Sequence, residues 1–277
     1  MLKEFIRIIL LFGTTSFILV QPSFYFLVHS LFIFDTSSFY LWHSIYGSLT
    51  MTTLDNPVWH ALQTVHRTLA QGTASVQRYK AGVLQVMGAE HPETAPYNEL
   101  LDWLTVGEKM FTVGDVPVLP DNWRYIMQVD CLQMICGQKA DVPNTDVVKL
   151  EDKNLADMLT LINISLPGFF HEQTPLLGDY FGIFQEGRLV AMAGERMRLQ
   201  GYTEVSAVAT HPEFTGRGYA QQLVAHVVAK NLDAGIIPFL HVTATNERAV
   251  KVYEKLGFKT RRRVSFTQFE LLSKVVL

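Results

Sequence analysis

TEVSAVATHP (203–212), with TGRGYA (215–220) shortly after it, is the stretch that decides the fold. The first segment is β-branched and apolar up to its proline, which predicts a strand. The glycines stand where this strand gives way to an amphipathic helix over 219–231, and glycine lets backbone N–H groups approach a ligand closely. N–H groups in the first turn of a helix lack intrahelical partners and, with the helix dipole, favour an anion. The stretch therefore predicts a strand, a loop that binds a pyrophosphate, and a helix.

Other glycine-rich motifs fit these residues less well. The dinucleotide fingerprint needs glycine or alanine at position 221, where this chain has Gln221. The P-loop needs four residues between its glycines, followed by Lys and Ser or Thr, and nothing in the sequence matches it. A nucleotide-bearing cofactor other than a dinucleotide is therefore favoured.

A second motif follows downstream, as Asn246, Ala249 and Tyr253 before Gly257-Phe258. The first three residues are spaced i, i+3 and i+7, which places them on one face of a helix that Gly257 ends. Asn246 also suits the N-cap of that helix. Each residue has an ordinary structural use as well, Asn246 as a cap and Tyr253 as a core aromatic.

Together the two motifs resemble the GNAT superfamily of N-acetyltransferases over residues 145–277. The loop pattern of that family is Gln or Arg, two residues, Gly, one residue, then Gly or Ala. Here these positions are Thr215, Gly218 and Ala220, and Thr215 departs from the pattern. The resemblance implies acetyl-CoA as co-substrate. The cofactor-binding residues it implies are Val208, Thr210, Thr215, Gly216, Arg217, Gly218, Tyr219, Ala220 and Asn246.

The resemblance also implies catalytic roles. Tyr253 would protonate the departing thiolate, and its ordinary pKa of about 10 lies above the roughly 8.5 of a thiol. The main-chain N–H near Val208 would polarise the thioester carbonyl. Glu204 is the candidate general base, and it shares a strand face with Val208 unless a bulge intervenes. The alternative is that Glu204 is a solvated glutamate without a catalytic role, and Glu195 and His211 are other candidates for acid–base catalysis.

The composition of the chain limits the kinds of ligand and partner that it is expected to bind. Among 277 residues, 23 are basic and 26 acidic, so no electrostatic footprint for nucleic acid exists. The expected acceptor is a small-molecule or peptide amine. Cys131 and Cys136 lie five apart on an expected strand and face opposite sides, which argues against a disulfide and agrees with a reducing, cytoplasmic compartment. No His and Cys cluster has metal-ligand spacing, so no metal is expected.

Residues 1–50 are apolar, with Lys3, Glu4, Arg7 and Asp35 as their only Asp, Glu, Lys or Arg residues. The apolar runs over 5–20 and 24–34 fall short of the roughly 20 residues of a membrane span. A signal peptide is disfavoured because no clear cleavage site follows the apolar run. Translation from Met51 is favoured, and a membrane anchor stays open.

Residues 51–140 are expected to form an N-terminal α/β subdomain. Asn56 and Pro57 predict the start of a helix that ends near Gly72. Further elements are expected as strands over 82–87, 109–113 and 125–136 and a helix over 97–104. The polar stretch 138–145 is the expected linker. This part is expected to cover a sheet edge or to wall the acceptor pocket.

Residues 145–277 are expected to form a GNAT domain of mixed α/β class, with a central mixed sheet flanked by helices. Strands are predicted over 146–150, 180–185, 189–197, 203–210, 239–243 and 264–269, with helices over 155–162 and 219–231 and around Tyr253. The loop 167–179, with Phe169, Phe170 and His171, is expected to recognise the acceptor. The sequence thus predicts an acetyl-CoA-dependent N-acetyltransferase in which a primary amine attacks the thioester directly. A non-catalytic acyl-CoA sensor and a membrane-tethered interaction protein are the alternatives.

Overall fold

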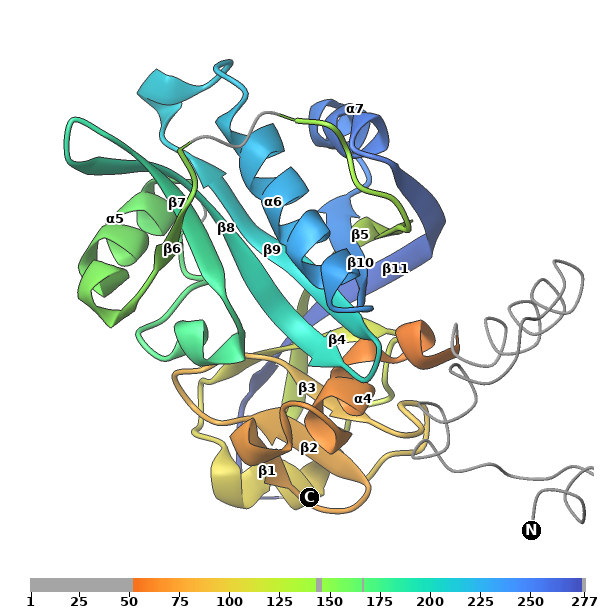
Figure 1. The fold of residues 1–277 in the computed structure, drawn as a ribbon. Helices are drawn as coiled ribbons and strands as arrows, with labels where there is room; N and C mark the ends of the chain where they lie inside the picture. The colour runs from red at the N-terminus through yellow and green to blue at the C-terminus, as the bar shows by residue number, and fades with distance from the viewer. Residues whose placement is uncertain (1–51, 143–145, 166, 276–277) are drawn as a thin grey trace, which may run out of the picture. The chain divides into compact units, whose positions relative to one another are not determined.

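The computed structural model describes residues 52–142, 146–165 and 167–275, and Thr52–Leu277 forms one compact unit (Figure 1). The hypotheses on residues 1–50, concerning a start at Met51, a membrane anchor or a signal peptide, lie outside the described residues. Within those described ranges, no helix is both long and apolar enough to cross a membrane.

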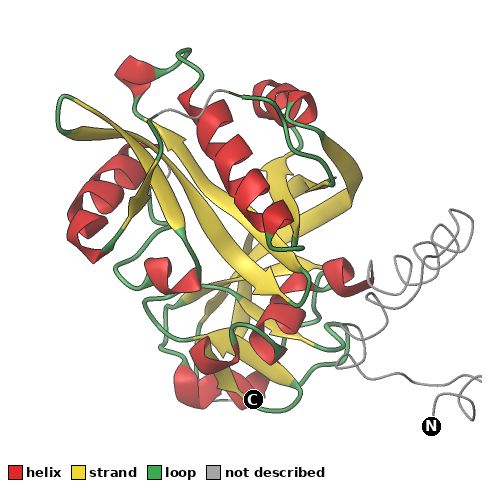
Figure 2. Ribbon diagram, in the orientation of Figure 1, coloured by secondary structure: helices red, strands yellow, loops and turns green. Residues whose placement is uncertain are grey.

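A mixed eight-stranded sheet is the centre of this unit, which confirms the mixed α/β class (Figure 2). The strand order is β4-β11-β5-β10-β9-β8-β7-β6. β9 and β10 run parallel, and every other neighbouring pair is antiparallel. The strands are β4 (Lys109–Gly114), β5 (Trp123–Cys136), β6 (Val148–Leu150), β7 (Tyr180–Gln185), β8 (Arg188–Leu199), β9 (Tyr202–Thr210), β10 (Ile237–Thr243) and β11 (Phe258–Leu271).

Helices cover both faces of the sheet. On one face α6 (Tyr219–Asp233) packs across β7 to β10, and α7 (Glu247–Lys255) packs on β11. On the other, α5 (Leu155–Ser165) packs on β8 and β9 (Figure 1). Four apolar residues of α6 pack toward the sheet and are 0–1% exposed: Leu223, Val224, Val227 and Val228. Burying each such side chain stabilises the fold by about 1.5–3 kcal/mol.

The N-terminal part differs from its prediction in several places. α4 (Pro57–Gln63) ends well before Gly72, and a short 3₁₀ helix and strand β1 (Ala70–Gly72) follow instead. β1 pairs with β2 (Val76–Tyr79), which pairs with β3 (Met87–Ala89). The strand expected over 82–87 begins only at Met87, because Gly82 has a φ of +81°. The helix expected over 97–104 is a 3₁₀ helix, Tyr97–Trp103.

Strands from both sides of the expected linker belong to one sheet. β5 pairs with both β10 and β11, and β4 pairs with β11. Residues before position 137 therefore supply two strands to the sheet that carries β9. This shared sheet brings the N-terminal part directly beside the candidate site.

Candidate active site

The loop before α6 has the form that an anion requires. Gly216 and Gly218 have φ values of +81° and +80°, a left-handed conformation that glycine adopts without strain. The hydrogen bond from Gln222 N–H to Gly218 O, at 3.1 Å, closes the first turn of α6. The N–H groups of Tyr219 and Ala220 lie within that turn, where the helix offers them no acceptor, and a Cβ built on Gly216 or Gly218 would meet nothing within 4 Å. The loop is thus open and lined by backbone donors, which fits a pyrophosphate.

Two side chains of this loop have their own contacts. Thr215 Oγ1 donates to Pro212 O at 3.0 Å, so its hydroxyl stabilises the loop. The exposed Arg217 guanidinium lies 4.7 Å from the centre of the Phe214 ring. Its positive charge therefore stays beside the open N–H groups, where an anion would gain from it.

The parallel strands β9 and β10 separate beside this loop. They pair only from Tyr202–Ile237 to Glu204–Phe239, while β10 continues against β5 through Thr243. β9 runs on to Thr210, which is half-buried and pairs with Ala191 on β8. The gap between the diverging strands therefore begins immediately after Glu204.

β9 bulges in this diverging part. Ala207 has a φ of +51°, and the register with β8 shifts so that Ala207 and Val208 lie between the paired residues Ser206 and Ala209. Ala207 packs with the cluster under α5, and Val208 packs with the cluster under α6. The bulge thus places Val208 on the face of Val205, opposite to Glu204, and leaves its backbone out of the register with β8.

Glu204 is fully buried and forms an ion pair with Arg196 of β8. Arg196 Nε donates to Oε2 at 2.8 Å and Nη2 donates to Oε1 at 2.6 Å. His241 Nδ1 donates to Oε1 at 2.8 Å. Burial alone would raise the pKa of Glu204, but the charge and hydrogen bonds of Arg196 and the hydrogen bond from His241 lower it to about 2. Glu204 is thus a carboxylate with little basicity.

A series of hydrogen bonds continues from Glu204 to Asp55, near the first described residue. His241 Nε2 accepts from Gln133 Nε2 at 3.1 Å, because Gln133 Oε1 already accepts from Arg261 Nη1 at 2.8 Å. Arg261 Nη2 in turn donates to Asp55 Oδ1 at 2.6 Å. This polar network fixes β5, β9, β10 and β11 around the gap.

Asn246 and Tyr253 lie at opposite ends of α7. Asn246 is the N-cap, and its Oδ1 accepts from Ala249 N–H at 3.1 Å, so its capping role is confirmed. Tyr253 packs against the cluster under α6, and its ring meets that of Phe258 edge to face at 5.8 Å. Burial raises the pKa of Tyr253 to about 12, so its phenol keeps its proton at neutral pH.

The rival acid–base groups are occupied elsewhere. Glu195 is fully buried, and Oε1 accepts from Lys230 Nζ at 2.8 Å and from Asn231 Nδ2 at 2.9 Å. His211 Nδ1 accepts from Glu213 N–H at 3.3 Å, and Arg188 contacts its other ring nitrogen. Both groups therefore have structural partners.

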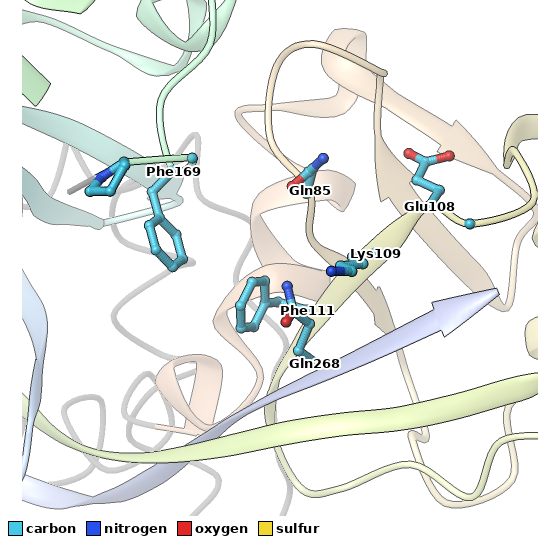
Figure 3. A pocket seen from close by; sticks show the side chains of 9 residues that line it. Gln85, Glu108, Lys109, Phe111, Phe169 and Gln268 are labelled. Carbon is cyan, nitrogen blue, oxygen red and sulfur yellow. The ribbon is translucent and has the colours of Figure 1, made fainter. Parts of the chain in front are cut away.

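A pocket drawn in Figure 3 extends toward the ion pair. Its outer cavity of about 370 Å³ continues into a smaller one of about 50 Å³, and Gln85, Phe111, Gly168 and Phe169 line both. Arg196 lines the inner cavity, so the pocket ends at the partner of Glu204. The expected acceptor loop lines the pocket through Phe169 and His171, while Phe170 is 5% exposed and packs on Tyr180.

The sequence motifs do not include the polar residues that surround Glu204 and line this pocket. Arg196 carried one signal, because Glu195, Arg196 and Arg198 are charged residues in a strand that is otherwise apolar from Leu189 to Leu199. The others come from distant strands, or in the case of Gln85 from the loop before β3, and only the fold brings them together: Gln85, Lys109, Gln133, His241 and Gln268.

The FR47-like protein family matches residues 180–267. No curated protein sequence matches the chain significantly. One similar crystal structure is that of a Novosphingobium aromaticivorans protein assigned to the GNAT family of acetyltransferases. Its sequence is 32% identical to this chain, the TM-score is 0.73, and the match covers 79% of this chain and 99% of that one.

Two more distant structures share the fold. A GCN5-related N-acetyltransferase from Kribbella flavida is 14% identical, with a TM-score of 0.50 and coverage of 77% of this chain and 93% of that one. A Drosophila protein is 14% identical, with a TM-score of 0.52 and coverage of 72% and 74%. By its identity to the Novosphingobium protein over most of its length, the chain belongs to the GNAT family of acetyltransferases.

Proposed function

We propose that this protein is an acetyl-CoA-dependent N-acetyltransferase whose acceptor is a primary amine. Membership of the GNAT family supports acetyl transfer in general. The observation that carries the finer proposal is the open, donor-lined loop of Gly216 to Ala220 next to the gap between β9 and β10. Neither alternative, an acyl-CoA sensor or a membrane-tethered interaction protein, gains support from the comparisons.

Acetyl-CoA supplies the acetyl group as a thioester. Backbone N–H groups of residues 217–220 would bind its pyrophosphate, with Arg217 adding charge, and Asn246 would lie along its arm. The Val208 N–H, which the bulge at Ala207 places outside the register pairs with β8, would donate to the thioester carbonyl. Such a donor in place before the reaction is worth about 3–4 kcal/mol in comparable sites.

Tyr253 would supply the proton that the thiolate takes up on leaving. The pKa of about 12 keeps the phenol protonated at every pH at which the enzyme would work. Neither cysteine is suited to act as a nucleophile, because Cys131 and Cys136 are both buried thiols whose pKa values burial raises. The amine would therefore attack the carbonyl directly.

Glu204 has two candidate roles in this proposal. As the proton acceptor expected from the sequence, it would take the ammonium proton through a water. As the partner of Arg196, it would hold the guanidinium at the inner end of the pocket. The pKa of about 2 favours the second role, because a base so far below working pH accepts protons poorly. An amine that loses its proton before binding needs no strong base.

The mode of transfer has a direct test. The full chain is incubated with acetyl-CoA without acceptor and its intact mass is measured, and initial rates are then recorded while both substrates are varied. Direct attack predicts an unmodified enzyme and intersecting double-reciprocal lines. An acetylated enzyme with parallel lines would instead establish a covalent intermediate.

A further inference from the structure

The acceptor pocket has a floor made by two paired strands. Gln268 of β11 is the register partner of Phe111 of β4, and Lys109 lies two residues from Phe111 on the same strand. Alternate residues of a strand share a face, so Lys109, Phe111 and Gln268 line one side of the pocket (Figure 3). Phe169 reaches the pocket from the opposite loop.

The charges that line this pocket do not balance. Glu108 Oε1 is paired with the buried Arg78 at 2.6 Å, and Oε2 accepts from Thr105 N–H at 3.0 Å. Arg196 is paired with Glu204. Among the residues that the structure describes, none forms an ion pair with the exposed ammonium of Lys109. The register partner of Lys109 is Glu270 of β11, whose carboxylate is paired with Arg124 at 2.5 Å. One positive charge therefore remains in excess around the pocket, which favours an anionic group on the ligand.

Arg196 adds an oriented donor at the inner end. Its Nε and Nη2 are engaged by Glu204, and in the described ranges Nη1 has no hydrogen-bond partner. Its side chain is 22% exposed, within the inner cavity. A ligand atom that meets Nη1 must accept a hydrogen bond, as a carboxylate or carbonyl oxygen does.

An aromatic wall completes the pocket. Phe169 is 58% exposed, and its ring lies 5.9 Å from that of Phe111. A phenyl ring left this open in a concave, partly polar site gains by covering itself with an apolar ligand group. The outer cavity of about 370 Å³ is near the lower end of ligand pockets, so the ligand is small.

We propose that the acceptor is a small amine that also carries a carboxylate and an aromatic group, with the carboxylate facing Lys109 and the aromatic group packed on Phe169 and Phe111. Aromatic amino acids and dipeptides that contain them belong to this class. This inference rests on the proposed function, because it assumes that the ligand of the pocket is the amine that is acetylated. The chemistry of the pocket itself is inferred from its lining residues alone.

Paired probes that differ only in the carboxylate test it in the full chain. Transfer from acetyl-CoA is measured to phenylalanine against phenethylamine, and to glycyl-phenylalanine against its amide. The binding of N-acetyl-phenylalanine and N-acetylphenethylamine is measured separately by calorimetry. We expect about a 10-fold preference for the carboxylated member of at least one pair, the size of a charge-assisted hydrogen bond.

Variants assign the preference to residues. Lys109→Met should abolish most of the preference and act mainly on KM, whereas Phe169→Ala should weaken both members of a pair alike. Lys274→Met is the matched control, since Lys274 is an exposed lysine that does not line the pocket. The control should keep the parental preference.

The outcomes separate this inference from the proposed function. Transfer to the neutral amines with no carboxylate preference would overturn the inference and leave the acetyltransferase intact. Carboxylate-dependent binding that Lys109→Met removes, without transfer to any amine, would support the pocket chemistry and count against the proposed function. A preference that persists in Lys109→Met would also overturn the inference.

Discussion

Arg196 and Glu204 form a two-pronged ion pair across neighbouring strands, with N–O distances of 2.8 and 2.6 Å. The register between β8 and β9 shifts between Glu195 and Arg198, so Arg196 and Met197 together lie opposite Glu204. The Glu204 side chain is 1% exposed and that of Arg196 22%. Removing one partner would therefore leave a buried charge without compensation.

The first prediction concerns stability in acid. The pKa of Glu204 falls from its ordinary value of 4.5 to about 2 on folding. A carboxyl group whose pKa is lowered on folding stabilises the fold at pH values above its pKa in the unfolded chain. This contribution, about 3 kcal/mol in all, is lost as the pH falls from about 4.5 through about 2. Urea unfolding measured at several pH values should show this loss, and Glu204→Gln should flatten it.

Asp130→Asn is the control for that series, because Asp130 is an exposed carboxylate of β5 outside the pair. It should keep the acid dependence of the parent. If Glu204→Gln had the same acid dependence as the parent, the pair would not hold Glu204 ionised.

The second prediction separates the two roles of Glu204. If Glu204 anchors Arg196, then Glu204→Gln and Arg196→Lys should lower kcat/KM by similar factors, because lysine cannot form the two-pronged contact. If Glu204 is the base, Glu204→Gln should lower kcat/KM by about 10²–10⁴-fold. Arg196→Lys would then lower kcat/KM much less, because the Glu204 carboxylate is still present. Initial rates between pH 6 and 9 distinguish the two patterns.

The third prediction concerns Tyr253. Tyr253→Phe should lower kcat by about 10²-fold or more, since the leaving thiolate loses its acid, and should leave CoA affinity unchanged. With a pKa of about 12, Tyr253 should also cause no fall in rate below pH 10. Tyr125→Phe, an exposed tyrosine of β5, is the matched control. Equal kcat values for parent and Tyr253→Phe would remove Tyr253 from the catalytic set.

The fourth prediction concerns the pyrophosphate loop. Gly218→Ala forces alanine to a φ of +80°, which costs about 1–2 kcal/mol and distorts the N–H cradle. We expect CoA affinity to fall at least 10-fold by calorimetry. Gly201→Ala imposes the same strain at φ +81°, in the turn between β8 and β9, and a Cβ there also meets nothing within 4 Å. If both variants bound CoA like the parent, the loop would not be the cofactor site.

The C-terminal half was predictable from its sequence because its local signals agree with one another. The apolar runs of β7 and β8, the glycines before α6 and the Asn246 cap each specify one conformation. The turn at Glu186 and Gly187 takes positive φ at both residues, 51° and 77°, as its position between two strands predicts. These predictions were confirmed to within a few residues.

The N-terminal part and the surroundings of Glu204 were less predictable. In the sequence, the helical spacing of apolar residues in α4 continues to Leu69. In the structure, Val65 is 48% exposed because the chain turns away to form β1. His241, Gln133 and Arg261 meet only because β5 lies between β10 and β11. Contacts of this kind depend on strand order, which no local pattern of one sequence encodes.

The most direct test of the central claim is acceptor-dependent thiol release from acetyl-CoA by the full chain, with the acetylated amine measured in the same samples. The account predicts that thiol appears only when an amine is present, in equal amount to the acetylated amine, and that Tyr253→Phe slows both together. Thiol release that ignores the amine, or none from any amine although CoA binds, would contradict the claim that this protein is an N-acetyltransferase.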